Sequence, residues 1–204
     1  KRAYLDRADA LVEEINQTEQ RVDAWRKDKP NKQLAMQIKK AINTRVGQIA
    51  AHEQGIQSSS GALLVAFREF GAEGAQPGTE VAPPALYCAW LFAYALVDQC
   101  EVIMISNAAF AWPCAMVATR VFQACPLSKH YFEGLMARAC RYSVPQYVVK
   151  TADMSVEEWE AKRGRKVKKN VESGKDPLEP EDKFFKRMVG FLRLWFAVLV
   201  WGKD

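Results

Sequence analysis

The chain has 204 residues, of which 49% are hydrophobic and 26% are charged, so its composition is close to the globular average and excludes a wholly disordered chain. Its 29 lysine and arginine residues against 24 aspartate and glutamate residues give a net charge of +5, which suits an anionic partner but does not require nucleic acid. The longest apolar stretch, Ala85–Val97, is shorter than the roughly 20 residues that cross a bilayer, so no membrane span is predicted.

The N-terminal segment, residues 2–28, is predicted to form a charged helix. Its apolar positions recur every three or four residues, at Leu11, Ile15, Val22 and Trp25, with Thr18 between them. Two interpretations stay open: the end of a coiled coil that enters from a preceding region, or a helix that packs on its own domain. We therefore divide the chain into an N-terminal helix, residues 1–30, and a helical-repeat domain, residues 31–204.

Seven further helices are predicted from periodicity and from their stop signals, at residues 33–57, 62–70, 85–106, 108–124, 128–140, 155–164 and 181–200. Ser60, Ser128 and Ser155 are the expected N-caps of three of them. Pro113 must lie in the first turn of its helix or kink it. Residues 142–150, which include Pro145, are predicted to be extended, and Gly/Pro-rich residues 71–84 to form a surface loop.

The predicted fold class is all-α, because no segment alternates in the manner of a strand. Antiparallel helix pairs joined by short loops favour a helical-repeat architecture of the HEAT or eIF4G-middle-domain type. The last predicted helix is apolar on more than one face, with Phe184, Phe191 and Trp195 among its residues and Trp201 directly after it. An apolar surface of this size is normally buried against another part of a protein, so we expect further helices after it.

The motifs that carry most enzyme chemistry are absent from the sequence. It has no glycine-rich phosphate loop, no HExxH and no GxSxG. The five cysteines lie in apolar stretches without a CxxC pair, which favours reduced thiols in the nucleus or cytosol and no metal site. A catalytic pair of Cys125 and His130 is better explained by chance proximity. The sequence therefore predicts a binding or regulatory module and not an enzyme.

Four sequence strings resemble one known family in the same order. They are INTRVGQ at 42–48, NAAFAWPCAMVA at 107–118, CRYSVPQY at 140–147 and DKFFKRMVGFLRL at 182–194. Together they resemble the C-terminal domain of the Gle-one family of nuclear-pore mRNA export mediators. The resemblance extends from about residue 34 to residue 200.

The resemblance implies an all-helical, eIF4G-middle-domain-like module that runs on for further helices. Members of that family bind a DEAD-box RNA helicase at the cytoplasmic face of the nuclear pore and stimulate its ATPase cycle and RNA release. In some fungal members inositol hexakisphosphate (IP6) bridges the two proteins. The implied partners also include an FG-repeat nucleoporin and translation factors, with RNA contacted only indirectly. The implied locations are the pore, the cytoplasm and the nucleus.

The resemblance also suggests which residues would hold a polyphosphate. Lys39, Lys40, Arg138 and Lys166 stand where polyphosphate-binding members have basic residues. Several converging lysines and arginines are needed, because each phosphate exchanges water for charge-assisted hydrogen bonds. The alternative is that all four are ordinary solvated charges.

Three residues depart from the pattern of the polyphosphate-binding members. Tyr94 and Asp98 occupy positions on the apolar helix where such members are basic, and Ala139 replaces a frequent lysine. A carboxylate at Asp98 would repel a ligand with many negative charges. The sequence therefore predicts weak or absent IP6 binding, with direct protein contacts carrying the affinity for the helicase.

A cluster of basic residues, Lys162–Lys169, allows a second function. It is either a nuclear-import signal, an RNA-contacting strip or a solvated linker. The alternative function is therefore a helical-repeat RNA-binding or translation-factor adaptor. The cluster has no interleaved aromatic residues, so base stacking is not predicted.

Overall fold

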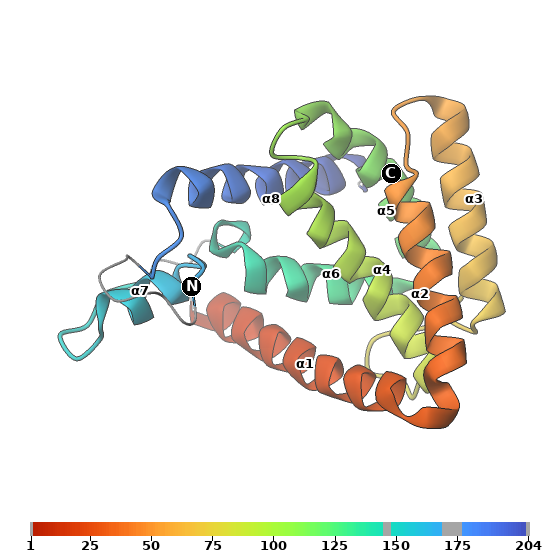
Figure 1. Cartoon of the computed structure of the whole chain (residues 1–204), viewed down its shortest axis with the longest axis horizontal. Coiled ribbons are helices and arrows are strands. Elements are labelled where there is room, and N and C mark those ends of the chain that lie inside the picture. The colour runs from red at the N-terminus through yellow and green to blue at the C-terminus, as the bar shows by residue number, and fades with distance from the viewer. Residues whose placement is uncertain (1, 145–147, 169–176, 203–204) are drawn as a thin grey trace.

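The computed structural model describes residues 2–144, 148–168 and 177–202, and this part of the chain is helical (Figure 1). The helices are α1 (Arg2–Lys27), α2 (Lys32–Gly47), α3 (Glu53–Glu69), α4 (Pro83–Val102), α5 (Ala111–Ala124), α6 (Pro126–Ala139), α7 (Val156–Lys162) and α8 (Glu181–Trp201). Short 3₁₀ turns occupy Lys29–Asn31, Ala108–Phe110 and Arg141–Ser143. Extended pairing among the described residues is limited to one bridge between Val167 and Leu178. The predicted all-α class is confirmed.

Helix α4 is the centre of the fold, as its continuous apolar sequence requires. Residues on every side of it are buried, including Phe92, Leu96 and Cys100. It packs against α2, α6, α8 and α1, while α2 and α3 stand side by side at one flank (Figure 1). None of the helices in the described ranges is long and apolar enough to cross a membrane.

Helix α1 packs on the domain through its apolar stripe. Ile15 and Val22 are almost completely buried in the common core. Gly134 of α6 lies so close to Ile15 that no Cβ would fit between the two helices without displacing that side chain. Glu14 on α1 also pairs with His130 on α6 at 2.9 Å. A coiled coil before this helix stays a prediction.

The break between the second and third helices lies at residues 48–52, and the predicted break at residues 58–61 is wrong. Helix α3 runs through the serines, and Ser60 is buried inside it, where its hydroxyl donates to the Ile56 carbonyl at 2.5 Å. This bond satisfies the hydroxyl within the helix, so Ser60 is not an N-cap. His52 is the cap, because its Nδ1 accepts from the Gly55 N–H at 3.0 Å.

The other predicted caps had mixed outcomes. Ser128 is not an N-cap, because Pro126 already begins α6 and Cys125 precedes it; the Ser128 hydroxyl instead donates to the Ala89 carbonyl of α4 at 3.2 Å. The Ser155 cap is confirmed by a capping box with Glu158, whose reciprocal bonds measure 3.0 and 3.1 Å.

Three further element boundaries differ from the sequence-based expectations. Helix α4 ends at Val102, before the predicted residue 106, and α5 begins at Ala111, after the predicted residue 108. Pro113 lies in the first turn of α5, which is one of its two expected positions. The segment expected to be extended from residue 142 starts instead with the end of a 3₁₀ turn at Ser143, and the next residue, Val144, has extended backbone angles. Pro145 lies outside the described residues, as does much of the linker at 169–176.

A buried cation joins α8 to the rest of the domain. The Arg187 guanidinium bonds to Glu179 at 2.6 and 3.1 Å and to the Gly164 carbonyl at 2.7 Å. It also lies 3.8 Å from Glu101 of α4. Burial alone would raise the pKa of Glu179, but the hydrogen bonds from Arg187 and from the Lys166 backbone lower it overall. The carboxylate is therefore held ionised beside its partner.

All five cysteines are free and buried. Burial raises the pKa of each thiol, to about 12 for Cys114, so the reactive thiolate form is strongly disfavoured. Within the described ranges, no cluster of three or more histidine, cysteine, aspartate or glutamate residues could hold a metal ion.

Candidate functional site

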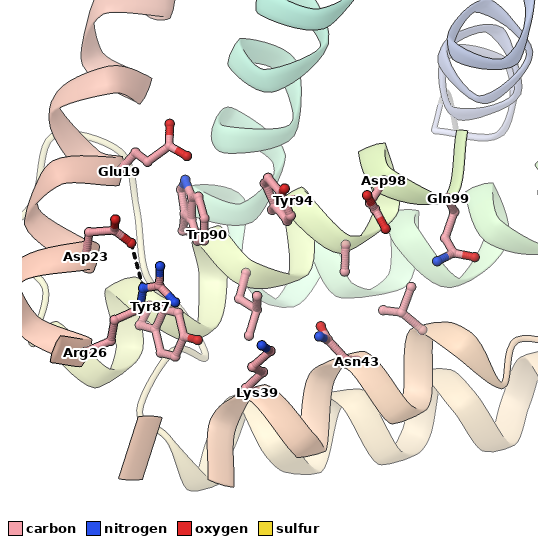
Figure 2. Close-up of a pocket in the computed structure, with 13 residues that line it drawn as sticks. Glu19, Asp23, Arg26, Lys39, Asn43, Tyr87, Trp90, Tyr94, Asp98 and Gln99 are labelled. Carbon is pink, nitrogen blue, oxygen red and sulfur yellow. Dashed lines mark hydrogen bonds and ion pairs between the residues drawn. The ribbon is translucent and has the colours of Figure 1, made fainter. Parts of the chain in front are cut away.

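The candidate site is an open groove of about 450 Å³ between α1, α2 and α4, which we call the α1–α2–α4 groove (Figure 2). Helix α1 contributes Glu19, Asp23 and Arg26 to it, and α2 contributes Lys39 and Asn43. The groove exists because α1 and α2, which are consecutive in the chain, diverge from each other and both pack against the later helix α4 (Figure 1).

The α4 wall of the groove is aromatic and polar. Trp90, Tyr94 and Asp98 are four residues apart, so they lie on one face of the helix, with Gln99 beside them. The Trp90 and Tyr94 rings stack with centroids 5.1 Å apart and an interplanar angle of 21°. Trp90 is only 7% exposed, whereas Tyr94 is 41% exposed. The Tyr94 ring is therefore available to a partner while Trp90 supports it from behind.

The charges on the α1 wall are already paired. Arg26 donates to Asp23 at 2.6 Å, and this hydrogen bond lowers the pKa of Asp23. On the same helix, Glu19 accepts from Arg138 of α6 at 2.6 Å, and Asn16 accepts from the same guanidinium at 3.1 Å. The paired carboxylates leave little net charge on this side.

The structure does not gather the four predicted polyphosphate residues into one pocket. Lys39 lines the α1–α2–α4 groove, but its neighbour Lys40 is exposed and does not line it. Arg138 is held by Glu19, and Lys166 is held by an ion pair with Glu101 of α4.

The structure also places the three residues that depart from the pattern of the polyphosphate-binding members. Tyr94 and Asp98 lie in the groove, on the α4 wall, where both side chains are exposed. Ala139 is the last residue of α6 and is not among the residues that line the groove. The two departures on α4 therefore face any ligand that enters the groove.

Sequence reasoning missed several groove residues. It gave Glu19 and Asp23 no role, yet both line the groove with side chains about one-third exposed. It also attached no function to Asn43, Trp90 or Gln99. The three-to-four-residue spacing on each helix was visible in the sequence, but the meeting of the three helices was not.

The basic cluster Lys162–Lys169 is largely occupied by internal pairs in its described part. Arg163 stacks on the Trp159 ring at 4.7 Å and pairs with Glu160 at 3.0 Å. Arg165 donates to the Glu179 carbonyl at 2.6 Å. Lys162 and Lys168 are exposed, and Lys169 lies outside the described residues. Only part of the cluster is thus free to contact an anionic partner.

A family model described as GLE1-like protein matches residues 13–202, nearly the whole of the described chain. The chain belongs to the GLE1-like family. The zebrafish (Danio rerio) mRNA export factor GLE1 is 30% identical over 184 residues, which cover 85% of this chain and 25% of that protein. The mouse (Mus musculus) mRNA export factor GLE1 is 26% identical, covering 85% of this chain and 24% of that protein. The chain spans about a quarter of the length of these relatives.

Two solved S. cerevisiae complexes contain a chain with a similar fold. Each is a variant Dbp5 C-terminal domain bound to Gle1 and IP6, with a variant Gle1 in the first. Their TM-scores are 0.65 and 0.63 at 15% and 16% sequence identity, and each match covers 92% of this chain and 61% of the solved chain. The family-model match confirms the family named from the four strings, and the similar solved chains confirm the helical fold.

Proposed function

We propose that this chain is the helicase-binding domain of an mRNA export factor. It binds a DEAD-box RNA helicase at the cytoplasmic face of the nuclear pore and stimulates the ATPase and RNA-release cycle of that helicase. The observation that carries the proposal is the family match over residues 13–202. It is supported by the likeness in fold to a chain in the two Dbp5–Gle1 complexes.

The chain acts in this proposal as a regulator and not as an enzyme. A protein that binds one arrangement of the two helicase lobes more tightly than the other shifts the population toward it and speeds product release. Such an effect requires a rigid surface. The buried α4 and the α1–α6 and α4–α8 contacts supply one.

Polyphosphate does not fit the α1–α2–α4 groove well. IP6 carries many negative charges, and its binding requires several unpaired cations in one place. Lys39 is the one lysine that lines the groove; Arg26 and Arg138 are already paired with carboxylates. Asp98 faces the same space and repels an anion. In our proposal, IP6 binds weakly or not at all, and direct protein contacts carry the affinity for the helicase.

The other partners follow from the family resemblance and remain predictions. They are an FG-repeat nucleoporin and translation factors, with RNA contacted only indirectly. The predicted locations are the nuclear pore complex at its cytoplasmic face, the cytoplasm and the nucleus.

The test is steady-state ATP hydrolysis by the cognate helicase in the presence of RNA, with and without this chain, each at zero and saturating IP6. The rate is expected to rise with the chain and to depend little on IP6. An unchanged rate would remove the proposed function. The alternative adaptor function, which the exposed Lys162 and Lys168 favour, predicts instead direct RNA binding whose affinity falls steeply as salt rises.

A further inference from the structure

We propose that one end of the α1–α2–α4 groove, formed by Tyr94, Asp98 and Gln99, binds a cationic side chain, arginine or lysine, of a protein partner. The inference rests on the proposed function to the extent that the partner is the helicase. It assigns to the groove a ligand of the opposite charge to a polyphosphate.

Charge is distributed unevenly along the groove. Figure 2 shows Arg26 and Lys39 toward one end and Asp98 and Gln99 at the other. Asp98 is exposed and has no hydrogen bond or ion pair with any other residue that the structure describes. An exposed and unpaired carboxylate on a groove wall favours a cation from outside.

The ring of Tyr94 offers one open face to a cation. One face of the ring stacks on Trp90, and the residue is 41% exposed. Tyr94 and Asp98 are one helical turn apart, so their Cβ atoms are separated by about 5–6 Å. A guanidinium or ammonium group placed over a tyrosine ring lies within about 6 Å of its centroid. One cation can therefore contact the ring and the carboxylate at the same time.

Two buried polar atoms on α4 lack hydrogen-bond partners in the part of the chain that the structure describes. Neither the Trp90 indole N–H nor the Gln99 Oε1 atom has a hydrogen-bond partner among the described residues, and Trp90 is only 7% exposed. Both atoms are enclosed, so a ligand removes the cost of the missing bond only where a small side-chain shift opens a path to them. Trp90 needs an acceptor and Gln99 needs a donor.

A peptide can meet both hydrogen-bonding requirements, whereas a polyphosphate cannot. A polypeptide segment offers a backbone carbonyl to Trp90 and side-chain N–H groups to Gln99 and Asp98. A fully ionised polyphosphate offers only acceptors, so it leaves Gln99 without a donor and places its charge beside Asp98. The groove therefore suits a segment of a protein partner that carries one cation.

The first experiment measures the affinity of the intact cognate helicase for the full chain. Asp98→Asn keeps the shape of the side chain and removes its charge. Its affinity is expected to fall by about 3- to 30-fold, the effect of losing a partly desolvated cation contact. The matched control is Asp6→Asn, at an exposed position near the start of α1, and its affinity should equal that of the original chain. Equal affinity for Asp98→Asn would overturn the proposed site and leave the proposed function intact.

The second experiment does not depend on the helicase. N-acetyl-arginine amide is titrated into the ¹⁵N-labelled chain and compared with N-acetyl-norleucine amide, which has no cation. Saturable shifts at Tyr94, Asp98 and Gln99 with the arginine probe alone, lost in Asp98→Asn, would support the site even if the helicase did not bind. Without saturable shifts at these residues, the site would be rejected whatever the helicase does.

Discussion

Replacing Gly190 with alanine should destabilise the domain, because α8 crosses α4 at this glycine. A Cβ at residue 190 would meet the backbone carbonyl oxygen of Cys100 at a separation that real Cβ atoms do not reach. A flexible side chain could turn away, but a backbone oxygen within a helix can move only if the helix moves. The two helices must therefore separate or tilt, which also disturbs the Arg187 contacts that hold the same crossing.

The expected magnitude comes from two opposing effects. Alanine in place of glycine inside a helix stabilises by about 1 kcal/mol. Overpacking a dense core costs typically about 1–3 kcal/mol, and a clash with rigid backbone lies at the upper end of this range or beyond it. For Gly190→Ala we expect a net loss of about 2 kcal/mol or more in the free energy of unfolding.

The control for this prediction is the same substitution at Gly61. This residue is exposed in the middle of α3, and a Cβ there would have nothing within 4 Å. Gly61→Ala should therefore raise the free energy of unfolding by up to about 1 kcal/mol. Urea denaturation followed by circular dichroism measures both variants. If Gly190→Ala were as stable as Gly61→Ala, the described α4–α8 crossing would be wrong.

Three further predictions concern α1, the α8 ion pair and the groove. Ile15→Ala should lower the free energy of unfolding by about 2–5 kcal/mol, since the side chain is fully buried; no change in urea denaturation would contradict the docking of α1. Glu179→Gln should lower it by about 1–3 kcal/mol at pH 7. Because the pKa of Glu179 is lowered in the folded state, its contribution is present at neutral pH and lost as the pH falls through that lowered pKa; a difference unchanged at pH 2 would refute this. In calorimetric titration with IP6, Lys39→Ala should weaken any measurable binding and Lys40→Ala should not, and equal effects would place the polyphosphate outside the groove.

Much of the fold could be predicted from local patterns. Residues 85–97 are apolar on all sides, which predicts a central buried helix, and this became α4. Ser155 with Glu158 three positions later predicts a capping box, because both bonds form within one helical turn. Four short strings were sufficient to name the family. These features depend on residues that are close in the sequence.

Other features depended on contacts between distant residues. From the sequence alone, Ser60 resembles an N-cap, but the structure places the preceding helix break earlier and Ser60 inside α3. Ser128 also resembles an N-cap, but its hydroxyl bonds to a carbonyl of α4. Arg138 reads as a free cation, but Glu19, more than a hundred residues earlier, neutralises it. When a side chain forms its hydrogen bond or ion pair with a distant helix, the neighbouring sequence does not reveal that partner.

The sequence by itself determined the helical class, the family and the unusual residues Tyr94 and Asp98. Tertiary structure alone decided which charges are paired, which polar atoms are left without partners and where three helices open into a groove. The physical reason is that helix formation depends on neighbours within a turn or two, whereas the charge and shape of a binding surface depend on side chains that only folding brings within a few ångströms.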